Sequence, residues 1–187
     1  TCERLALNLL QRMSGIATTT RSYVDAVNGT GAKILDTRKT VPGLRLLDKY
    51  AVGAGGGANH RMGLYDNILI KDNHIKLDGG IAGAVESVRD IYGGKYSIEV
   101  ETETIGQVRE ALAAEADIIM LDNMSLEEMD QAVHIINKGA LTEASGGIKL
   151  ENIREIAETG VDFISVGALT HSIRALDIGL DIRYIKK

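Results

Sequence analysis

The sequence predicts an α/β fold, arranged as an incomplete TIM-like barrel of about seven strands behind a leading N-terminal helix. Three observations support this prediction. Short apolar strands alternate with helical segments along the whole chain. Such alternation is typical of parallel strands joined by right-handed helical crossovers. Polar residues or glycines follow one strand after another, and a barrel gathers its strand ends at one mouth.

The helices are expected from apolar residues that recur on one face, as Leu5, Leu9 and Met13 do in the first. In chain order they cover residues 3–13, 17–27, 44–52, 81–91, 105–114, 126–136 and 150–158. The clearest strands cover residues 33–35, 67–70, 96–100, 117–121, 141–144 and 162–166, and a last apolar stretch covers 176–182. Ser14-Gly15 is expected to end the first helix, and Pro42 to begin the helix after the first strand.

Length and composition fit one globular catalytic domain that covers residues 1–187. The hydrophobic fraction of 44% is ordinary for such a domain. A single cysteine, Cys2, excludes an internal disulfide framework and fits a reducing, cytoplasmic location. No apolar stretch has the length of a transmembrane helix, so no membrane partner is expected. The chain enters a helix at once without a starting Met, and we expect it to be a piece of a longer protein.

The net charge of −5 is unevenly distributed. Residues 33–76 carry eight Lys and Arg against four Asp and Glu, whereas residues 77–187 carry ten against twenty. Nucleic-acid binding requires a broad basic face, so no nucleic-acid partner is expected. One basic segment in an acidic chain instead favours a small polyanion as the ligand.

Cations follow the first strand and the segments after it. Arg38 and Lys39 come directly after residues 33–35, and His60, Arg61 and Lys71 follow. Arginine binds carboxylate or phosphate oxygens through two parallel hydrogen bonds, and lysine adds a compact charge. For the first pair alone, a solvated basic turn is the competing interpretation. Because the group carries more positive charge than one phosphate requires, a second, multiply charged anion is expected.

Later strand ends carry carboxylates and then glycines. Glu101 and Asp122 follow neighbouring strands, where each is either a helix cap or a solvated acid, or part of a Mg²⁺ site completed by water and substrate oxygens. Ser145-Gly146-Gly147 and, one unit later, Gly167-Ala168 predict a phosphate cradle of backbone N–H groups and a helix N-terminus. Glycines here can equally serve only as turns, but many barrels bind phosphate near their final strands.

An open, doubly wound sheet is the competing architecture, with ligands at its switch point. The barrel is favoured because six strands in succession end in functional side chains or glycines. The chain is shorter than the roughly 250 residues typical of eight units, so we expect an incomplete barrel that another domain closes.

Long motifs carry a specific resemblance that spans essentially the whole chain. They are E-R-x-A-L-N-L-L-Q-R-M-S-G-I-A-T (3–18), K-I-L-D-T-R-K-T-V-P-G-L-R (33–45), G-G-G-x-N-H-R-M-G-L (55–64), I-L-I-K-D-N-H (68–74), I-E-V-E-T (98–102), I-M-L-D-N (119–123), E-A-S-G-G-I (143–148) and D-F-I-S-V-G-A-L-T-H-S (162–172). The chain resembles the quinolinate phosphoribosyltransferases, also called nicotinate-nucleotide pyrophosphorylases (carboxylating). The resemblance covers their C-terminal barrel, so the family's N-terminal open-faced domain is absent from this chain.

The resemblance implies a reaction of NAD biosynthesis that uses Mg²⁺. Quinolinate displaces pyrophosphate from phosphoribosyl pyrophosphate and loses CO₂, which gives nicotinate mononucleotide. It also implies a homodimer or higher homo-oligomer whose active site is shared, with Arg4 contributed by the neighbouring subunit.

The residue roles that the resemblance implies fall into four sets. The quinolinate-binding set is Arg4, Thr37, Arg38, His60, Arg61 and Lys71. The phosphate-binding set is Lys39, Ser145, Gly146, Gly147, Gly167, Ala168 and His171. The catalytic set is Lys39, Lys71, Glu101 and Asp122, and Glu101 and Asp122 also form the metal set.

Three alternatives remain open. A paralogous phosphoribosyltransferase found with molybdate-transport genes would act on another heterocycle. A non-catalytic homologue would only assemble with a partner, although it need not keep charges at its strand ends. An aldolase-like barrel would use Lys71 as a Schiff-base lysine.

Overall fold

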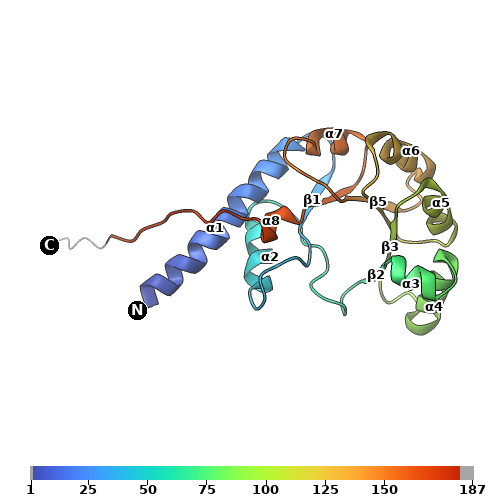
Figure 1. The fold of residues 1–187 in the computed structure, drawn as a ribbon, viewed down its shortest axis with the longest axis horizontal. Coiled ribbons are helices and arrows are strands. Elements are labelled where there is room, and N and C mark those ends of the chain that lie inside the picture. The colour runs from blue at the N-terminus through green and yellow to red at the C-terminus, as the bar shows by residue number, and fades with distance from the viewer. Residues whose placement is uncertain (1, 182–187) are drawn as a thin grey trace.

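The computed structural model describes residues 2–181, and its centre is one curved sheet of six parallel strands (Figure 1). The strands are β1 (Lys33–Leu35), β2 (Ile68–Ile70), β3 (Ile98–Thr102), β4 (Ile118–Asp122), β5 (Leu141–Ser145) and β6 (Phe163–Ser165). They lie in the order β1-β6-β5-β4-β3-β2, so the last strand pairs with the first, as in a barrel. The predicted parallel, barrel-type fold is therefore confirmed.

The expected count of about seven strands is wrong, because the seventh position holds only one parallel bridge, between Leu35 and Ala58. The glycine-rich run before Ala58 forms a turn, and no ladder of hydrogen bonds continues beyond it. Among the described residues the sheet is consequently open between the Ala58 segment and β2.

Eight described helices accompany the strands, and those between β2 and β6 lie on the outer side of the sheet (Figure 1). They are α1 (Cys2–Ala26), α2 (Arg45–Ala54), α3 (Asp72–Leu77), α4 (Ile81–Tyr92), α5 (Ile105–Ala113), α6 (Leu126–Ile136), α7 (Ile153–Glu158) and α8 (Ala168–His171). The short helices α3 and α8 were not expected, because four to six residues are too few for an apolar period to be seen.

Two expected boundaries are wrong. Ser14-Gly15 does not end a helix, because α1 runs unbroken from Cys2 to Ala26. A Cβ atom on Gly15 would lie 2.3 Å from the carbonyl oxygen of Arg174, so this glycine allows close packing of the chain. Pro42 does not begin a helix either. It lies in a turn in which Leu44 N–H donates to Val41 O (3.0 Å), and Gly43 supplies the positive φ of +79°.

The apolar core lies between the sheet and the outer helices. Ile98, Val100, Ile119 and Ile164 are fully or almost fully buried, because alternate residues of each strand face the helices. The other face of each strand points into the barrel. Two acids, Glu99 and Glu143, are buried on the strands β3 and β5.

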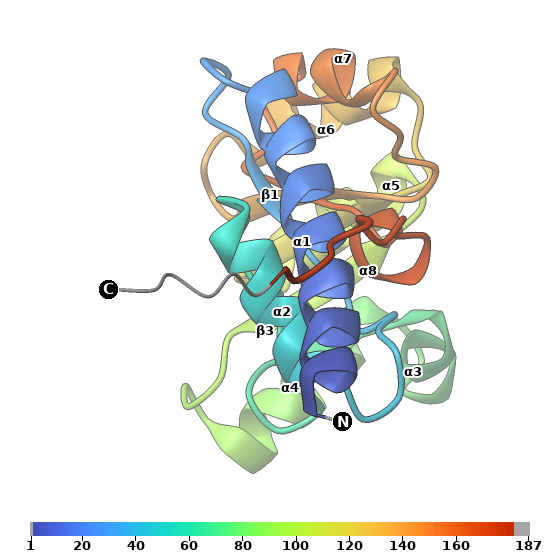
Figure 2. The same ribbon diagram turned by 90° about the vertical axis from the view of Figure 1, so that its left-hand side faces the viewer.

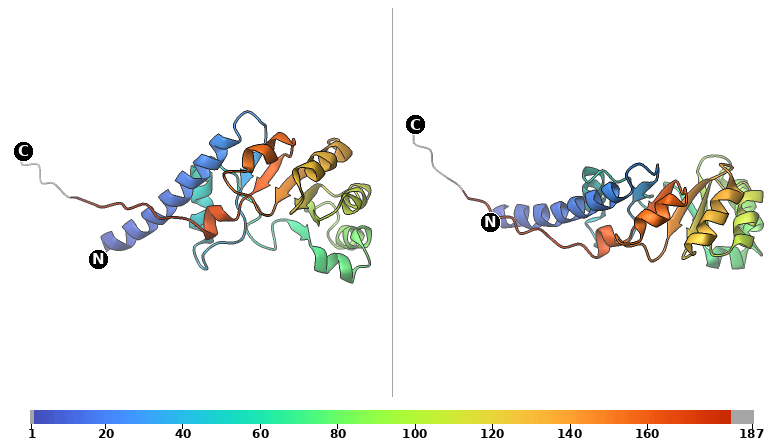
Figure 3. Two further views of the ribbon diagram at one scale, coloured as in Figure 1. Left: turned by 45° about the horizontal axis from the view of Figure 1, so that its top comes forward. Right: turned by 90° about the horizontal axis from the view of Figure 1, so that it is seen from above.

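Helix α1 packs on α2, and α1 and the C-terminal segment run side by side away from the sheet (Figures 2 and 3). Arg12 of α1 donates through two nitrogens to the fully buried Asp48 of α2, at 2.9 and 2.8 Å. Residues 173–181 form no helix or strand, and the last residue of the expected apolar stretch 176–182 lies outside the described residues. Leu176 N–H donates to Gln11 O (3.1 Å), which attaches this segment to α1.

No helix in the described range 2–181 is long and apolar enough to cross a membrane.

Two neighbouring glycines test the packing of α1 on α2. A Cβ atom on Gly55 would lie 2.5 Å from Ala17 O and 2.7 Å from Thr20 Cβ, whereas one on Gly53 meets nothing within 4 Å. We expect Gly55→Ala to lower the free energy of unfolding by about 1–3 kcal/mol, because overpacking forces the helices apart. Gly53→Ala, its matched control, should be neutral or stabilising by up to about 1 kcal/mol. Urea unfolding measures both, and equal effects would contradict the close packing.

Candidate active site

A cavity of about 690 Å³ lies at the carboxyl ends of the strands. Its lining contains every residue that the sequence placed in the site except Arg4. These are Thr37, Arg38, Lys39, His60, Arg61, Lys71, Glu101, Asp122, Ser145, Gly146, Gly147, Gly167, Ala168 and His171. Segments that are far apart in the sequence meet here because all six strands are parallel.

Two arginines and a lysine supply unpaired positive charge to the cavity. In the described part of the chain, the side chains of Arg38 and Lys39 make no ion pair. Burial, and next the nearby charge of Arg38, lower the pKa of Arg61. Two guanidinium groups that lie close together without a shared acid favour an anionic ligand with several oxygens.

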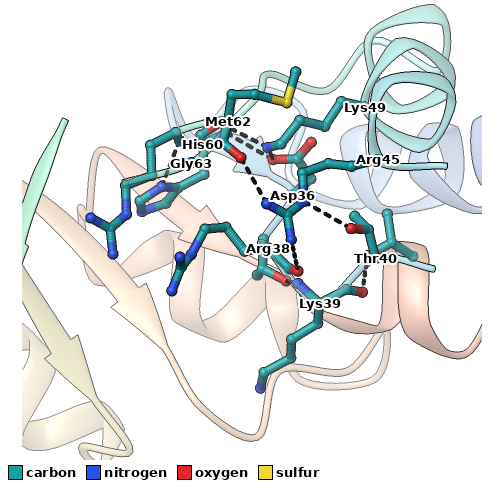
Figure 4. A network of polar contacts seen from close by, with 12 residues as sticks. Asp36, Arg38, Lys39, Thr40, Arg45, Lys49, His60, Met62 and Gly63 are labelled. Atoms are coloured by element: carbon teal, nitrogen blue, oxygen red, sulfur yellow. Dashed lines mark hydrogen bonds and ion pairs between the residues drawn. The ribbon is translucent and has the colours of Figure 1, made fainter. Parts of the chain in front are cut away.

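A buried ion pair holds the segment that carries His60 and Arg61. Lys49 Nζ, only 2% exposed, donates to Asp36 Oδ1 (2.5 Å) and to His60 O (2.8 Å). The His60 N–H donates to the same Asp36 oxygen at 2.8 Å (Figure 4). Burial raises the pKa of Asp36, and the bonds from Lys49 and His60 oppose this. These bonds connect β1, α2 and the 58–61 segment where strand pairing is reduced to one bridge.

Arg45, which lies outside the cavity, links the loop that carries Arg38 to the loop that carries Arg61. Its guanidinium donates to Arg38 O (3.2 Å), to Met62 O (3.0 Å) and, through Nε, to Thr40 Oγ1 (3.0 Å) (Figure 4). The planar fork of arginine suits three acceptors that lie in different directions. The backbones that carry Arg38 and Arg61 are therefore held relative to each other.

The two predicted carboxylates lie on adjacent strands, where Glu101 of β3 pairs with Met120 and Asp122 ends β4. Lys71 Nζ forms an ion pair with Glu101, whereas Asp122 accepts a hydrogen bond from the amide of Asn123 (2.8 Å). Neither carboxylate belongs to a described cluster of three metal-ligating side chains. A cation at Asp122 and Glu101 would therefore need oxygens from water and from substrate, which is how Mg²⁺ is commonly bound.

The predicted phosphate cradle has open backbone but little helix behind it. Gly146 and Gly147 adopt φ values of +91° and +62°, which side chains rarely tolerate. A Cβ atom on Gly167 would lie 3.0 Å from the ring of His171 and 3.3 Å from Lys39 Cδ, so two basic side chains converge over this glycine. The expected helix N-terminus is missing behind Gly146-Gly147, because α7 begins six residues after Gly147, whereas the four-residue helix α8 begins at Ala168 with Gly167 as its N-cap.

Two buried acids at the cavity were missed by the sequence reasoning: Glu143, which lines it, and Glu99, which does not. Glu99 and Glu143 are 0% and 1% exposed, and both lie near His60 Nε2, at 3.1 Å (Glu99 Oε2) and 3.6 Å (Glu143 Oε1). Burial, and next the charge of Glu99, raise the pKa of Glu143 to about 8. Strand parity could have found them, since Glu99 lies two residues before Glu101 and Glu143 two before Ser145, on the same face of each strand.

Arg4 lies apart from this cavity. It is exposed in the first turn of α1, and the cavity of its own chain does not include it. Its expected contact with a neighbouring subunit stays a prediction.

Comparison with known proteins gives one consistent family. The family model described as "Quinolinate phosphoribosyl transferase, C-terminal domain" matches residues 16–181. A probable nicotinate-nucleotide pyrophosphorylase (carboxylating) of Bacillus subtilis is 53% identical over 96% of this chain and 62% of its own length. The nicotinate-nucleotide pyrophosphorylase (carboxylating) of Mycobacterium leprae is 52% identical over 97% of this chain and 65% of its own length. This chain thus spans less than two thirds of both relatives.

A solved structure agrees with the sequence relatives. The nicotinate-nucleotide pyrophosphorylase of Ehrlichia chaffeensis superposes with a TM-score of 0.92 at 49% identity, over 97% of this chain and 66% of that one. Since the matched residues include all six strands and all the cavity segments, the chain belongs to the quinolinate phosphoribosyltransferase family and corresponds to its C-terminal domain.

Proposed function

We propose that this chain is the catalytic barrel of an enzyme that transfers phosphoribosyl from phosphoribosyl pyrophosphate to quinolinate, with decarboxylation to nicotinate mononucleotide. The observation that carries the proposal is the pair of guanidiniums, Arg38 and Arg61, in the same cavity as the Gly146-Gly147 and Gly167 backbone. The guanidinium pair suits a planar dicarboxylate, and the glycine backbone suits a phosphate. The names of the relatives support the same reaction.

The two ligand sites divide the cavity. Arg38, Arg61 and Thr37 would bind the carboxylates of quinolinate, with Lys71 beside them. Lys39, Ser145, the glycines, Ala168 and His171 would bind the 5′-phosphate. Both ligands are polyanions that repel each other in water, so the cations and backbone N–H groups promote the reaction first by holding them together.

The chemistry needs no nucleophile from the protein. The pyridine nitrogen attacks C1 of the ribose as pyrophosphate leaves, and the C1 centre becomes oxocarbenium-like. Glu101 and Asp122 face the cavity, where their negative charge would stabilise that developing positive charge. We propose that Mg²⁺ is held by Asp122 and Glu101 with substrate oxygens, where it would neutralise the pyrophosphate.

The alternatives differ in what the same residues would do. A Schiff-base mechanism needs a free lysine amine, whereas the amine of Lys71 forms an ion pair with Glu101. A phosphoribosyltransferase for another heterocycle would not need both guanidiniums for a dicarboxylate. Nicotinate, which has one carboxylate, is therefore the informative competing substrate.

The function is tested by following the release of CO₂ and pyrophosphate from quinolinate and phosphoribosyl pyrophosphate, with a chain of the relatives' full length. We expect one CO₂ for each pyrophosphate, and no turnover of nicotinate. Arg38→Lys should raise the KM for quinolinate by about tenfold or more, because the planar fork is lost although the charge remains. Equal use of nicotinate, or an unchanged KM in Arg38→Lys, would contradict the proposal.

The metal assignment gives a separate prediction. Asp122→Asn should raise the Mg²⁺ concentration needed for half-maximal rate by about tenfold, since a charged oxygen ligand becomes neutral. Asp130→Asn, at an exposed position on α6, is the matched control and should leave the Mg²⁺ titration unchanged. Superimposable titrations for wild type and Asp122→Asn would remove Asp122 from the metal site.

We also propose that the active protein is a homodimer or higher homo-oligomer in which Arg4 enters the partner's cavity. In the full-length protein, Arg4→Ala and Lys71→Ala should each lose nearly all activity. Mixed dimers should regain up to about half of the wild-type activity, because one of their two sites receives both intact residues, so an equal mixture in which half the dimers are mixed should regain about a quarter. If mixed dimers form but remain inactive, Arg4 does not act across an interface.

A further inference from the structure

His60 has both ring nitrogens occupied by the protein. The backbone N–H of Arg61 donates to Nδ1 at 2.7 Å. Nε2 lies 3.1 Å from Glu99 Oε2 and 3.6 Å from Glu143 Oε1. The side chain is 11% exposed, so only part of the ring reaches the cavity. In this arrangement neither nitrogen is free for a ligand.

The two contacts indicate which ring nitrogen of His60 carries the proton. A nitrogen that accepts from an N–H group carries no proton, whereas a nitrogen that faces two carboxylates carries one. Glu99 Oε1, Glu99 Oε2 and Glu143 Oε1 have no hydrogen-bond partner among the described residues, and a proton on Nε2 would face two of these oxygens, Glu99 Oε2 and Glu143 Oε1. Burial lowers the pKa of His60, but the two acids outweigh it and raise that pKa. Protonation of Nδ1 would nevertheless break the bond to Arg61.

A series of hydrogen bonds connects His60 to Arg61. The backbone of His60 is held by Asp36 and Lys49, and its ring holds the N–H of Arg61. The Arg61 guanidinium donates to Asn67 O at 3.1 Å, so Arg61 is fixed at both ends. This matters because the segment has only the Ala58 bridge in place of a strand.

We propose that His60 is a positioning residue rather than a substrate ligand: Glu99 and Glu143 hold its ring, and Nδ1 holds the backbone of Arg61. The inference rests on the proposed function and deepens it, because it assigns quinolinate recognition to the two arginines. The same three side chains could in principle hold a metal ion, since their ligand atoms lie within 4.8 Å of one another. The guanidiniums of Arg61 and Arg38 nearby oppose a further cation.

Two substitutions separate the roles of the two ring nitrogens. Asparagine places a carbonyl oxygen near the position of Nδ1, whereas glutamine places an amide N–H near the position of Nε2. We expect His60→Asn to keep the Arg61 bond and to raise the quinolinate KM by about threefold or less. His60→Gln should raise it by about thirtyfold, with kcat changed less than KM, since Arg61 is misplaced. The reverse order would make Nε2 a substrate contact and overturn the proposal.

A spectroscopic measurement tests the tautomer without relying on activity. The chain has four histidines, and the ¹⁵N resonances of His60 are assigned by their loss in His60→Asn. We expect an unprotonated Nδ1 and a protonated Nε2 at about pH 8, and Glu99→Leu should disturb both. Glu103→Gln, exposed on the same segment, is the control and should disturb neither. A protonated Nδ1 in the wild type would contradict the proposal even if quinolinate proves to be the wrong substrate.

Titration with Zn²⁺, which is diamagnetic, completes the test. We expect the His60 resonances to stay unchanged at micromolar metal. A shift that is lost in Glu143→Gln would show that the cluster is a metal site, and would overturn the positioning role. If the wild type turns over no quinolinate but keeps the expected tautomer, only the proposed function fails.

Discussion

Repulsion between like charges is the constraint on which the site depends. Arg38 and Arg61 line one cavity from different loops. Within the described part of the chain, no acid forms an ion pair with Arg38. Left to itself, such a pair would move apart into solvent. The structure holds both backbones instead, through Arg45 on the outside and the Asp36–Lys49 pair on the inside. The ligand-free protein therefore keeps the cations in place before an anion arrives.

The Asp36–Lys49 ion pair is costly to break because both partners are buried. Removing one partner of a buried ion pair commonly destabilises a protein by about 3–5 kcal/mol, since the other charge is left unpaired. The Asp36–Lys49 pair also binds the His60 backbone, so its energy stabilises a segment that has almost no strand pairing. An apolar replacement of similar size would offer no hydrogen bonds to that segment. This explains why charged groups lie at a position where a barrel would otherwise have a seventh strand.

The strand ends were predicted well from the sequence, because strand periodicity and the polar residues or glycines that follow each strand are local signals. Eleven of the fourteen cavity residues named above end a strand or lie in the turn after it, and they needed only the assumption of parallel strands to be brought together. The other three are His60 and Arg61, which follow only the Ala58 bridge, and His171, which lies in α8. The features that the sequence analysis mispredicted or missed depend on tertiary contacts. Gly15 resembles a helix end, yet its reason is the carbonyl of Arg174, more than 150 residues away. Glu99 and Glu143 resemble ordinary surface acids until the barrel interior is known.

The central claim is that the ligand-free cavity holds mutually repelling cations. Its most direct test is the thermal unfolding of Arg38→Gln without any ligand, in a buffer free of phosphate and carboxylates. The account predicts that this variant melts higher than the wild type by roughly 2–4 °C, the shift that about 1 kcal/mol produces in a domain of this size. Arg109→Gln, on the exposed side of α5, should melt with the wild type. A lower melting temperature for Arg38→Gln would contradict the account, because the charge of Arg38 would then be stabilising the free protein.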